Sequence, residues 1–262
     1  MDNYEQFKKD VYQLTKIDLS SYKEKQMRRR IDSLITKNQC KEYPEYVKLL
    51  KTDRGAFDEF VNFLTINVSE FYRNPEQWDL LDKEFIPELI KKFDGNNLKI
   101  WSAACSTGDE PYSLVMALSR HLPLDKIRIT ATDIDKQVIA TAKVGLYAEK
   151  SITSVPADLK QKFFSKVGNS YQISEDVKKC VTFKEHNLLR DTYPTDCDLI
   201  VCRNVLIYFT DEAKTEVYSK FEKSLKDGGI LFIGSTEQVL EYRELGYSRR
   251  SSFYYEKKRM SE

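Results

Sequence analysis

The feature that most constrains the fold is an alternation of strand-like and helix-like segments that begins at Leu98. Short apolar runs, each long enough for one strand, are separated by segments with helical spacing. Strands that alternate with helices predict an α/β fold, doubly wound around a mostly parallel sheet. The strands are expected at 98–104, 127–133, 180–184, 197–202, 230–234 and, as a final edge strand, 253–256.

The first 70 or so residues follow a different pattern. Their apolar residues recur every three or four positions, and Gly and Pro are almost absent, which predicts a small helical domain over residues 1–70. A further helix at about 77–93 leads into the second domain, which spans 71–262. The segment 147–179 interrupts the alternation and contains a hairpin signal at Gly168-Asn169, so it predicts a small inserted β subdomain.

Composition excludes several classes of function. The 42 Lys and Arg residues nearly balance the 41 Asp and Glu residues, so net charge indicates no nucleic-acid partner. With two histidines and no CxxC pair, neither a metal site nor a Ser-His-Asp hydrolase is expected. No apolar stretch approaches the roughly 20 residues that span a bilayer, and the N-terminus is polar. We therefore expect a cytoplasmic protein that does not insert into the membrane.

The loop after the first predicted strand is the expected ligand site, because open α/β sheets bind ligands beyond the carboxyl ends of their strands. This loop, 105–110, has one glycine and so fits a pyrophosphate poorly. Its acids, Asp109 and Glu110, favour a cationic ligand such as S-adenosylmethionine. Asp133 closes the second strand, where an acid accepts hydrogen bonds from ribose hydroxyls. The alternative for Asp133 is an ordinary polar residue at a strand end.

Four segments together carry a family resemblance. They are Asn67–Arg73, Trp101–Ser113, Ala131–Asp135 and Cys202–Phe209, and their order and separation closely resemble the CheR-type chemotaxis receptor methyltransferases. The resemblance implies a Rossmann-like methyltransferase domain over 71–262 that uses S-adenosylmethionine and releases S-adenosylhomocysteine. It also implies methylation of glutamate side chains on the cytoplasmic domain of chemotaxis receptors, which serves sensory adaptation, and a monomeric enzyme.

The resemblance also implies roles for individual residues. Arg73 and Tyr208 correspond to residues that position the acceptor glutamate, and they are the predicted catalytic pair. The alternatives are an ion pair with an interface carboxylate for Arg73, a core position for Tyr208 and a plain turn role for Asn187. Departures from the family pattern occur at Ser69, Tyr72, Asn74 and Asp109. The predicted cofactor-binding residues are Asn67, Ser69, Arg73, Glu110, Asp133, Asn187, Leu188, Arg203 and Asn204.

A basic run on one N-terminal helix predicts how a receptor docks. Arg28, Arg29 and Arg30 concentrate positive charge there, although a solvated helix surface is the alternative. The hairpin around Val167–Ser170 is short, so we expect no dependence on a receptor tethering peptide. Two other readings stay open: a small-molecule methyltransferase with the same cofactor, and a non-catalytic module that binds nucleic acid through the basic run.

Overall fold

The computed structural model describes residues 3–65 and 69–259. Its contacts divide the chain into two compact units. The helical unit comprises Met1–Asn67 together with Leu206–Thr215, and the sheet unit comprises Val68–Val205 and Glu216–Glu262. Nothing in the sequence pattern indicates that Leu206–Thr215 packs with the N-terminal helices.

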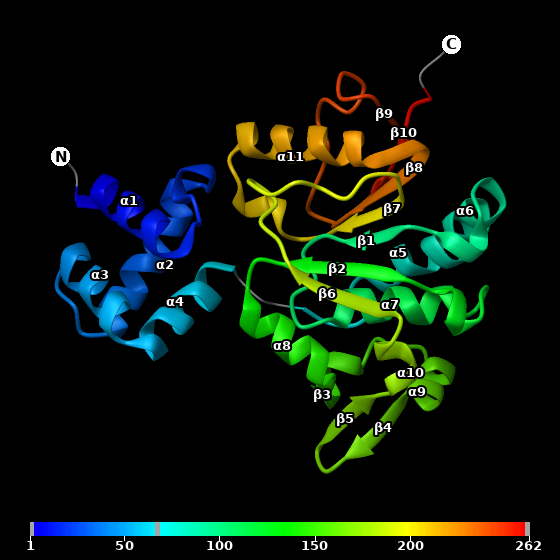
Figure 1. The fold of residues 1–262 in the computed structure, drawn as a ribbon, viewed down its shortest axis with the longest axis horizontal. Helices are drawn as coiled ribbons and strands as arrows, with labels where there is room; N and C mark the ends of the chain where they lie inside the picture. Colours follow the sequence, from blue (N-terminus) through cyan, green and yellow to red (C-terminus); the bar gives the residue numbers. More distant parts are fainter. Residues whose placement is uncertain (1–2, 66–68, 260–262) are drawn as a thin grey trace. The chain divides into compact units, whose positions relative to one another are not determined.

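The N-terminal helices of the helical unit are drawn in blue to cyan in Figure 1. They pack together because each helix has one apolar stripe to bury. Phe7 of α1 and Phe60 of α4 meet edge to face, with ring centroids 6.2 Å apart, and Tyr46 of α3 contacts Phe60 at 5.8 Å. The 206–215 segment joins this unit through main-chain hydrogen bonds, such as Thr210 N to Ser21 O at 2.9 Å. The helices of this unit are α1 (Asn3–Thr15), α2 (Glu24–Lys37), α3 (Tyr43–Thr52) and α4 (Arg54–Thr65).

The sheet unit contains a seven-stranded sheet in the order β6-β2-β1-β7-β8-β10-β9. The first five strands in this order are parallel, whereas β10 is antiparallel to both β8 and β9. The predicted doubly wound, mostly parallel sheet is therefore confirmed. Its strands are β1 (Ile100–Ser102), β2 (Ile129–Asp133), β6 (Val181–Glu185), β7 (Cys197–Cys202), β8 (Leu225–Ile233), β9 (Tyr247–Arg249) and β10 (Tyr254–Lys257).

Two details of the predicted sheet are wrong. The expected edge strand at 253–256 is the inner strand β10, and the edge is β9, a three-residue strand too short for an alternating pattern. The strand expected at 230–234 begins earlier, at Leu225. Its pairing with β7 shifts register between Cys197 and Leu199, because Gly228 and Gly229 lie inside β8.

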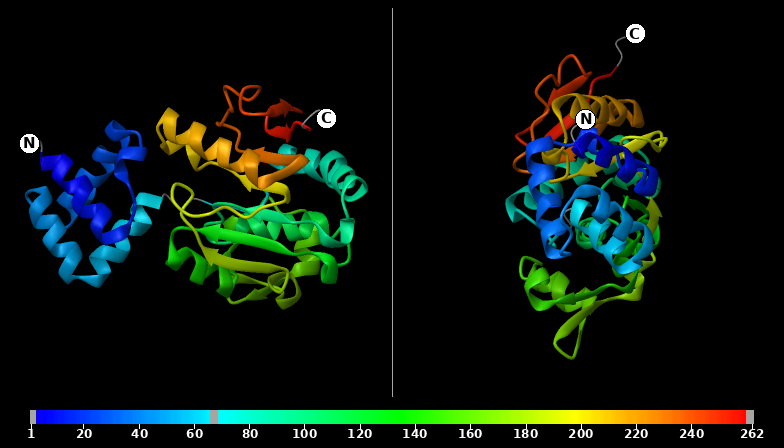
Figure 2. Two further views of the ribbon diagram at one scale, coloured as in Figure 1. Left: turned by 45° about the horizontal axis from the view of Figure 1, so that its top comes forward. Right: turned by 90° about the vertical axis from the view of Figure 1, so that its left-hand side faces the viewer.

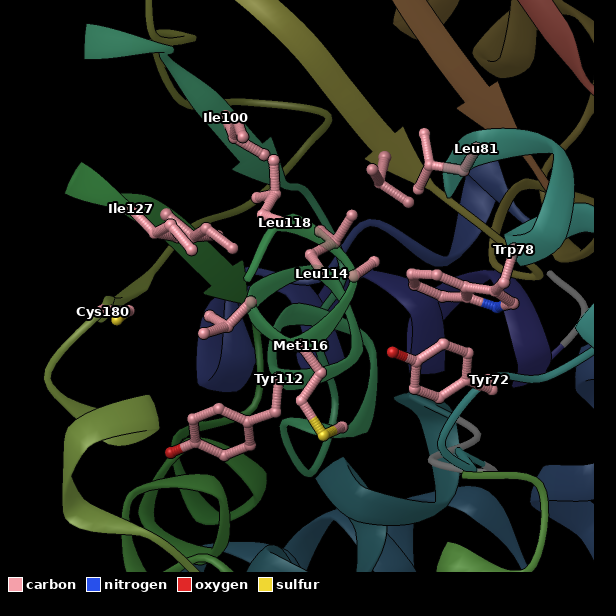
Figure 3. Packing of buried hydrophobic residues seen from close by; sticks show 14 of the residues in the cluster. Tyr72, Trp78, Leu81, Ile100, Tyr112, Leu114, Met116, Leu118, Ile127 and Cys180 are labelled. Carbon is pink, nitrogen blue, oxygen red and sulfur yellow. The ribbon is translucent and has the colours of Figure 1, made fainter. Parts of the chain in front are cut away.

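Helices cover both faces of the sheet. On one face every residue of α7 (Asp109–Leu118) is buried, and the core there includes Trp78 and Ile100 (Figure 3). On the other face Phe221 of α11 (Asp211–Ser224) contacts Trp101 of β1, with ring centroids 5.5 Å apart. The remaining helices of this unit include α5 (Pro75–Leu80), α6 (Ile86–Lys92) and α8 (Lys136–Val144).

The single helix expected at 77–93 is interrupted. A π-helical turn, Leu81–Phe85, separates α5 from α6, and Pro87 lies in the first turn of α6. Proline has no N–H to donate, so the regular hydrogen-bond pattern cannot continue through it. The interrupted helix still packs one side on the sheet, where Phe85 stacks on Tyr254 of β10 at 4.1 Å.

The predicted inserted β subdomain is confirmed as a second, three-stranded sheet in the order β3-β5-β4. Within the sheet unit it projects at the end opposite β9 and β10 (Figures 1 and 2). Gly168 and Asn169 form the hairpin between β4 and β5, and Gly168 has a φ of 59°. The elements are β3 (Leu146–Ala148), α9 (Ala157–Phe163), β4 (Phe164–Val167), β5 (Ser170–Ile173) and α10 (Glu175–Lys178).

In the described part of the chain, no helix is both long enough and apolar enough to cross a membrane.

Candidate functional site

The carboxyl ends of the parallel strands gather buried acids at one edge of the sheet. Glu110 lies in the first turn of α7, after β1; Asp133 ends β2; and Glu237 follows β8. All three are buried. Because carboxylates lose hydration when buried, a cluster of this kind favours a positively charged ligand.

The surroundings of Glu110 show how burial and neighbouring charges act on a carboxyl group in this cluster. Its Oε1 accepts a hydrogen bond from the Ser102 hydroxyl at 2.8 Å. Burial raises the pKa of Glu110 to about 7, against the opposing effect of the nearby Arg203 and Arg73 guanidinium groups and with a further increase from Glu237. The carboxylate at this position is therefore only partly stabilised by the protein's own cations.

Asp133 is held by main-chain donors. Its Oδ2 accepts from Ser106 N at 2.8 Å and its Oδ1 from Asp135 N at 3.0 Å, and burial raises its pKa to about 6. The main chain of Ile134 also donates to this carboxylate, which still has lone-pair capacity for a further donor. The Ser106 hydroxyl beside it is buried and has no hydrogen-bond partner among the described residues. Such an orphaned hydroxyl next to a carboxylate suits a polyhydroxyl ligand such as a ribose.

Ser69 reaches the same loop. Its hydroxyl hydrogen-bonds to the Asp109 carboxylate, which also accepts from the Thr107 hydroxyl at 2.6 Å. Burial raises the pKa of Asp109. Asn67, which was predicted to bind the cofactor beside Ser69, lies outside the described residues.

Arg203 follows β7 and holds the segment that carries Arg73. Its Nη2 lies 2.7 Å from Arg73 O, 2.8 Å from Gln77 Oε1 and 3.2 Å from Asn74 Oδ1. Its guanidinium stacks over the Phe232 ring, 4.7 Å from the centroid. All three acceptors are neutral, so the largest compensating negative charge for this buried cation comes from Glu110.

The Arg73 segment has an unusual backbone that these contacts fix. Tyr72 and Asn74 have φ values of 51° and 61°, in the left-handed region that side chains disfavour. Tyr72 N donates to Ser113 Oγ at 3.1 Å, and Arg73 O accepts from Trp78 Nε1 at 3.1 Å as well as from Arg203. The hydrogen bonds to Tyr72 N and Arg73 O therefore fix the backbone from which the Arg73 side chain extends.

Asn187 and Leu188 form the turn after β6. The Asn187 side-chain oxygen accepts from Leu189 N at 2.9 Å, which is the plain turn role that sequence reasoning left open. Leu188 is buried, and its carbonyl accepts from the Tyr193 hydroxyl at 2.6 Å. An adenine-flanking role for these two residues stays a prediction.

Tyr208 belongs to the helical unit, where it ends a short 3-10 turn that starts at Leu206. It is half-buried, and its carbonyl accepts from Lys23 N at 2.9 Å. The Arg30 guanidinium lies near Tyr208: burial lowers the pKa of Arg30, and Tyr208 opposes that effect. Arg30 also stacks on the Phe63 ring at 4.2 Å.

The three arginines of the predicted docking surface have different environments. Arg28 and Arg30 are half-buried; Arg28 lies over the Tyr4 ring, 4.9 Å from its centroid. Arg29 is exposed. Contacts inside the helical unit therefore use two of the three side chains, and Arg29 is the one most available to a partner.

Sequence reasoning missed Glu237 and Gln77. Glu237 accepts three main-chain hydrogen bonds, and Gln77 accepts one from Arg203. The only signals were a glutamate three residues after Gly234, at the end of a predicted strand, and a glutamine at the start of an apolar helix. Neither signal distinguishes a site residue from a surface residue.

Comparison with known proteins identifies the family. Residues 2–65 match a family model described as the CheR methyltransferase all-alpha domain, and residues 67–253 match the CheR methyltransferase SAM binding domain. The chain belongs to the CheR methyltransferase family. The predicted resemblance is confirmed. The chain is a methyltransferase, and its cofactor is S-adenosylmethionine. This cation fits the buried acids and the Ser106 hydroxyl, which has no partner in the part of the chain that the structure describes.

Similar proteins match along nearly their whole length. A chemotaxis protein methyltransferase of Listeria innocua is 43% identical over 239 residues, which cover 91% of each chain. One of Borreliella burgdorferi is 33% identical over 251 residues, covering 91% of this chain and 89% of the relative. Chemotaxis protein methyltransferase 1 of Pseudomonas aeruginosa is 32% identical over 248 residues, covering 90% of each chain.

Proposed function

We propose that this enzyme methylates glutamate side chains on the cytoplasmic domain of chemotaxis receptors, giving methyl esters and S-adenosylhomocysteine. The observation that carries the proposal is the anchored Arg73 segment beside the buried acid Glu110. An acid-lined edge suits a cationic methyl donor, and a guanidinium on an anchored backbone suits an anionic acceptor. The names of the similar proteins support chemotaxis as the setting.

The cofactor would be held from several elements. Glu110 and Asp133 supply carboxylates, of which Asp133 is suited to the ribose hydroxyls and Glu110 to the methionine end. When bound, S-adenosylmethionine supplies a methyl carbon activated by a positively charged sulfur. The family motifs support further contacts from Asn67, Ser69, Arg73, Asn187, Leu188, Arg203 and Asn204.

The acceptor requires no general base. A glutamate side chain has an ordinary pKa near 4.3, so it is already an anion at neutral pH. Transfer joins an anion to a cation and leaves neutral products, so charge is lost along the reaction and positioning matters more than electrostatic stabilisation. Alignment contributes roughly 7–11 kcal/mol in favourable cases. We assign this alignment to Arg73 and Tyr208, and we add Arg30 because its guanidinium lies near Tyr208.

The helical unit would dock the receptor. The exposed side chains of α2 include Lys25 and Arg29, whose charge complements glutamate-bearing helices. Since the β4–β5 hairpin is only a two-residue turn, we propose that docking does not depend on a receptor tethering peptide, and that the enzyme acts as a monomer.

The test is labelled methyl transfer from S-adenosylmethionine to receptor-containing membranes, with release of the label by alkali as the ester signature. Wild-type enzyme should label the receptor, and Arg73→Ala should lower turnover by about a hundredfold while keeping the fold. Arg128→Ala is the matched control, because Arg128 is exposed and precedes the amino end of β2. Preferential labelling of small carboxylic acids, or near-normal turnover by Arg73→Ala, would contradict the proposal.

A further inference from the structure

We infer that Glu237 is a positioning residue for the proposed methyl transfer. Its carboxylate fixes the β7 turn, Arg203–Val205, which follows β7 and precedes the segment that carries Tyr208. We call the contacts between the Glu237 carboxylate and this turn the latch. The latch is a structural feature of the sheet unit, and only its catalytic consequence rests on the proposed function.

Three main-chain N–H groups donate hydrogen bonds to the Glu237 carboxylate. Its Oε2 accepts from Asn204 N at 2.7 Å and from Gly234 N at 2.8 Å, and its Oε1 accepts from Val205 N at 3.1 Å. The residue is only 7% exposed. An ionised carboxylate accepts hydrogen bonds and donates none, so three N–H groups converging on it match its chemistry. One side chain thereby ties the loop after β7 to the loop after β8.

The β7 turn needs such an anchor because of its backbone. Asn204 has a φ of 61°, in the left-handed region that most side chains disfavour and that asparagine tolerates better than most. In turns of this kind consecutive N–H groups point to one place and form a concavity that binds anions. In this protein the anion is the Glu237 carboxylate rather than a ligand.

Gly234 makes the latch sterically possible. A Cβ added there would lie 2.7 Å from Glu237 Oε2, 2.8 Å from Asn204 N and 2.8 Å from Asn204 Nδ2. Real Cβ contacts are longer than these, and one of the three neighbours is main chain, so a side chain at 234 would push the two loops apart. The latch therefore needs both residues, which lie three positions apart in sequence: a carboxylate at Glu237 and no side chain at Gly234.

The β7 turn positions groups that the proposed reaction uses. Arg203, at its start, holds Arg73 O with a 2.7 Å hydrogen bond. From Val205 the chain continues directly into the Leu206–Tyr208 turn. A shift of the β7 turn would therefore displace the anchor of Arg73 and the starting point of Tyr208 together. Glu237 is assigned no contact with the acceptor and acts through these residues.

A second role for Glu237 predicts different behaviour. Its charge contributes to the raised pKa of Glu110, so it belongs to the acid cluster that suits a cation. If charge alone mattered, Glu237→Asp would behave as wild type, because it keeps the carboxylate. The latch predicts that Glu237→Asp fails, because a side chain shorter by one methylene cannot reach all three N–H groups.

The structural test is amide hydrogen exchange over residues 199–206 and at Gly234, measured on the full chain. Glu237→Gln, Glu237→Asp and Gly234→Ala should each speed exchange at Asn204 and Val205 by about tenfold or more. Glu244→Gln is the control, since it removes the same charge from an exposed glutamate. Exchange as slow as in wild type in all three variants would overturn the inference, whether or not the enzyme methylates receptors.

The catalytic test compares turnover with cofactor affinity. The latch predicts that all three variants lower kcat on receptor by about tenfold or more at saturating S-adenosylmethionine, with equal changes in affinity for the cofactor and for S-adenosylhomocysteine. Selective weakening of the positively charged cofactor in Glu237→Gln, with normal kcat at saturation, would show a charge role and overturn the latch. Gly234→Ala keeps the carboxylate, so the test stands even if Glu237→Gln does not fold.

Discussion

Replacing Glu110 by glutamine should stabilise the protein without its cofactor. In the wild type the Glu110 carboxyl is buried, and burial raises its pKa from 4.5 to about 7. Above that pH the fold contains a buried charge that its neighbours compensate only in part. Glutamine has nearly the same shape, cannot ionise, and keeps an oxygen that accepts the hydrogen bond from the Ser102 hydroxyl.

The magnitude follows from the shift in pKa. The folded protein binds the Glu110 proton more tightly than the unfolded chain does, so this group's contribution to stability is fully present below pH 4.5 and is lost as the pH rises through about 7. A shift of about 2.5 units corresponds to roughly 3 kcal/mol at 1.36 kcal/mol per unit. Glu110→Gln should therefore be more stable than wild type by up to roughly 3 kcal/mol at pH 8.

The assay is urea unfolding of the cofactor-free protein at pH 8, 7 and 5, followed by circular dichroism. The advantage of Glu110→Gln should be largest at pH 8 and should shrink toward zero at pH 5, because both proteins then carry a neutral group. Glu244→Gln, an exposed substitution, should show no such trend. The reasoning is refuted if Glu110→Gln is no more stable than wild type at pH 8. The same variant should bind S-adenosylmethionine more weakly, with a smaller loss for the uncharged S-adenosylhomocysteine.

Two further substitutions test other parts of the account. Arg29→Glu should lower receptor methylation by about tenfold, corresponding to about 1.4 kcal/mol, with unchanged affinity for S-adenosylhomocysteine; equal loss of both would indicate a folding defect instead. Arg30→Glu is a poorer test, since it also breaks the contact with Phe63. Tyr72→Phe removes a buried hydroxyl that has no partner among the described residues, so the melting temperature should stay the same or rise. A clear drop would show that this hydroxyl has a partner.

The sequence predicts the sheet well because its signal is local. The strand from Cys197 to Cys202 contains the apolar run Leu199–Cys202, and the structure buries all six residues of the strand. The same locality explains the errors at the edge. Tyr247–Arg249 has only one buried residue, so its pairing with β10 depends on long-range contacts that no local pattern reveals. Likewise, Leu206–Thr215 joins the helical unit through main-chain hydrogen bonds and through the contact between the Phe209 and Tyr22 rings, and no local pattern indicates either contact.

The site residues also fall into two groups, those that a local sequence pattern predicts and those that it does not. Glu110 and Asp133 follow strands directly, so the rule that ligands bind at carboxyl ends of parallel strands finds them. The anchors of Arg73 come from Trp78, five residues away, and from Ser113 and Arg203, which are distant in sequence and meet the Arg73 segment only in the folded chain. The role of Glu237 could not be predicted from the sequence for a similar reason. Its partners are main-chain N–H groups, which every residue except proline possesses.

The most direct measurement is mass-spectrometric mapping of a chemotaxis receptor after incubation with this enzyme and S-adenosylmethionine. We expect methyl esters only on glutamate side chains of the receptor's cytoplasmic helices, lost on alkaline treatment and nearly absent with Arg73→Ala. Methyl groups found on other residue types, or a receptor left unmodified by an enzyme that binds the cofactor, would contradict it.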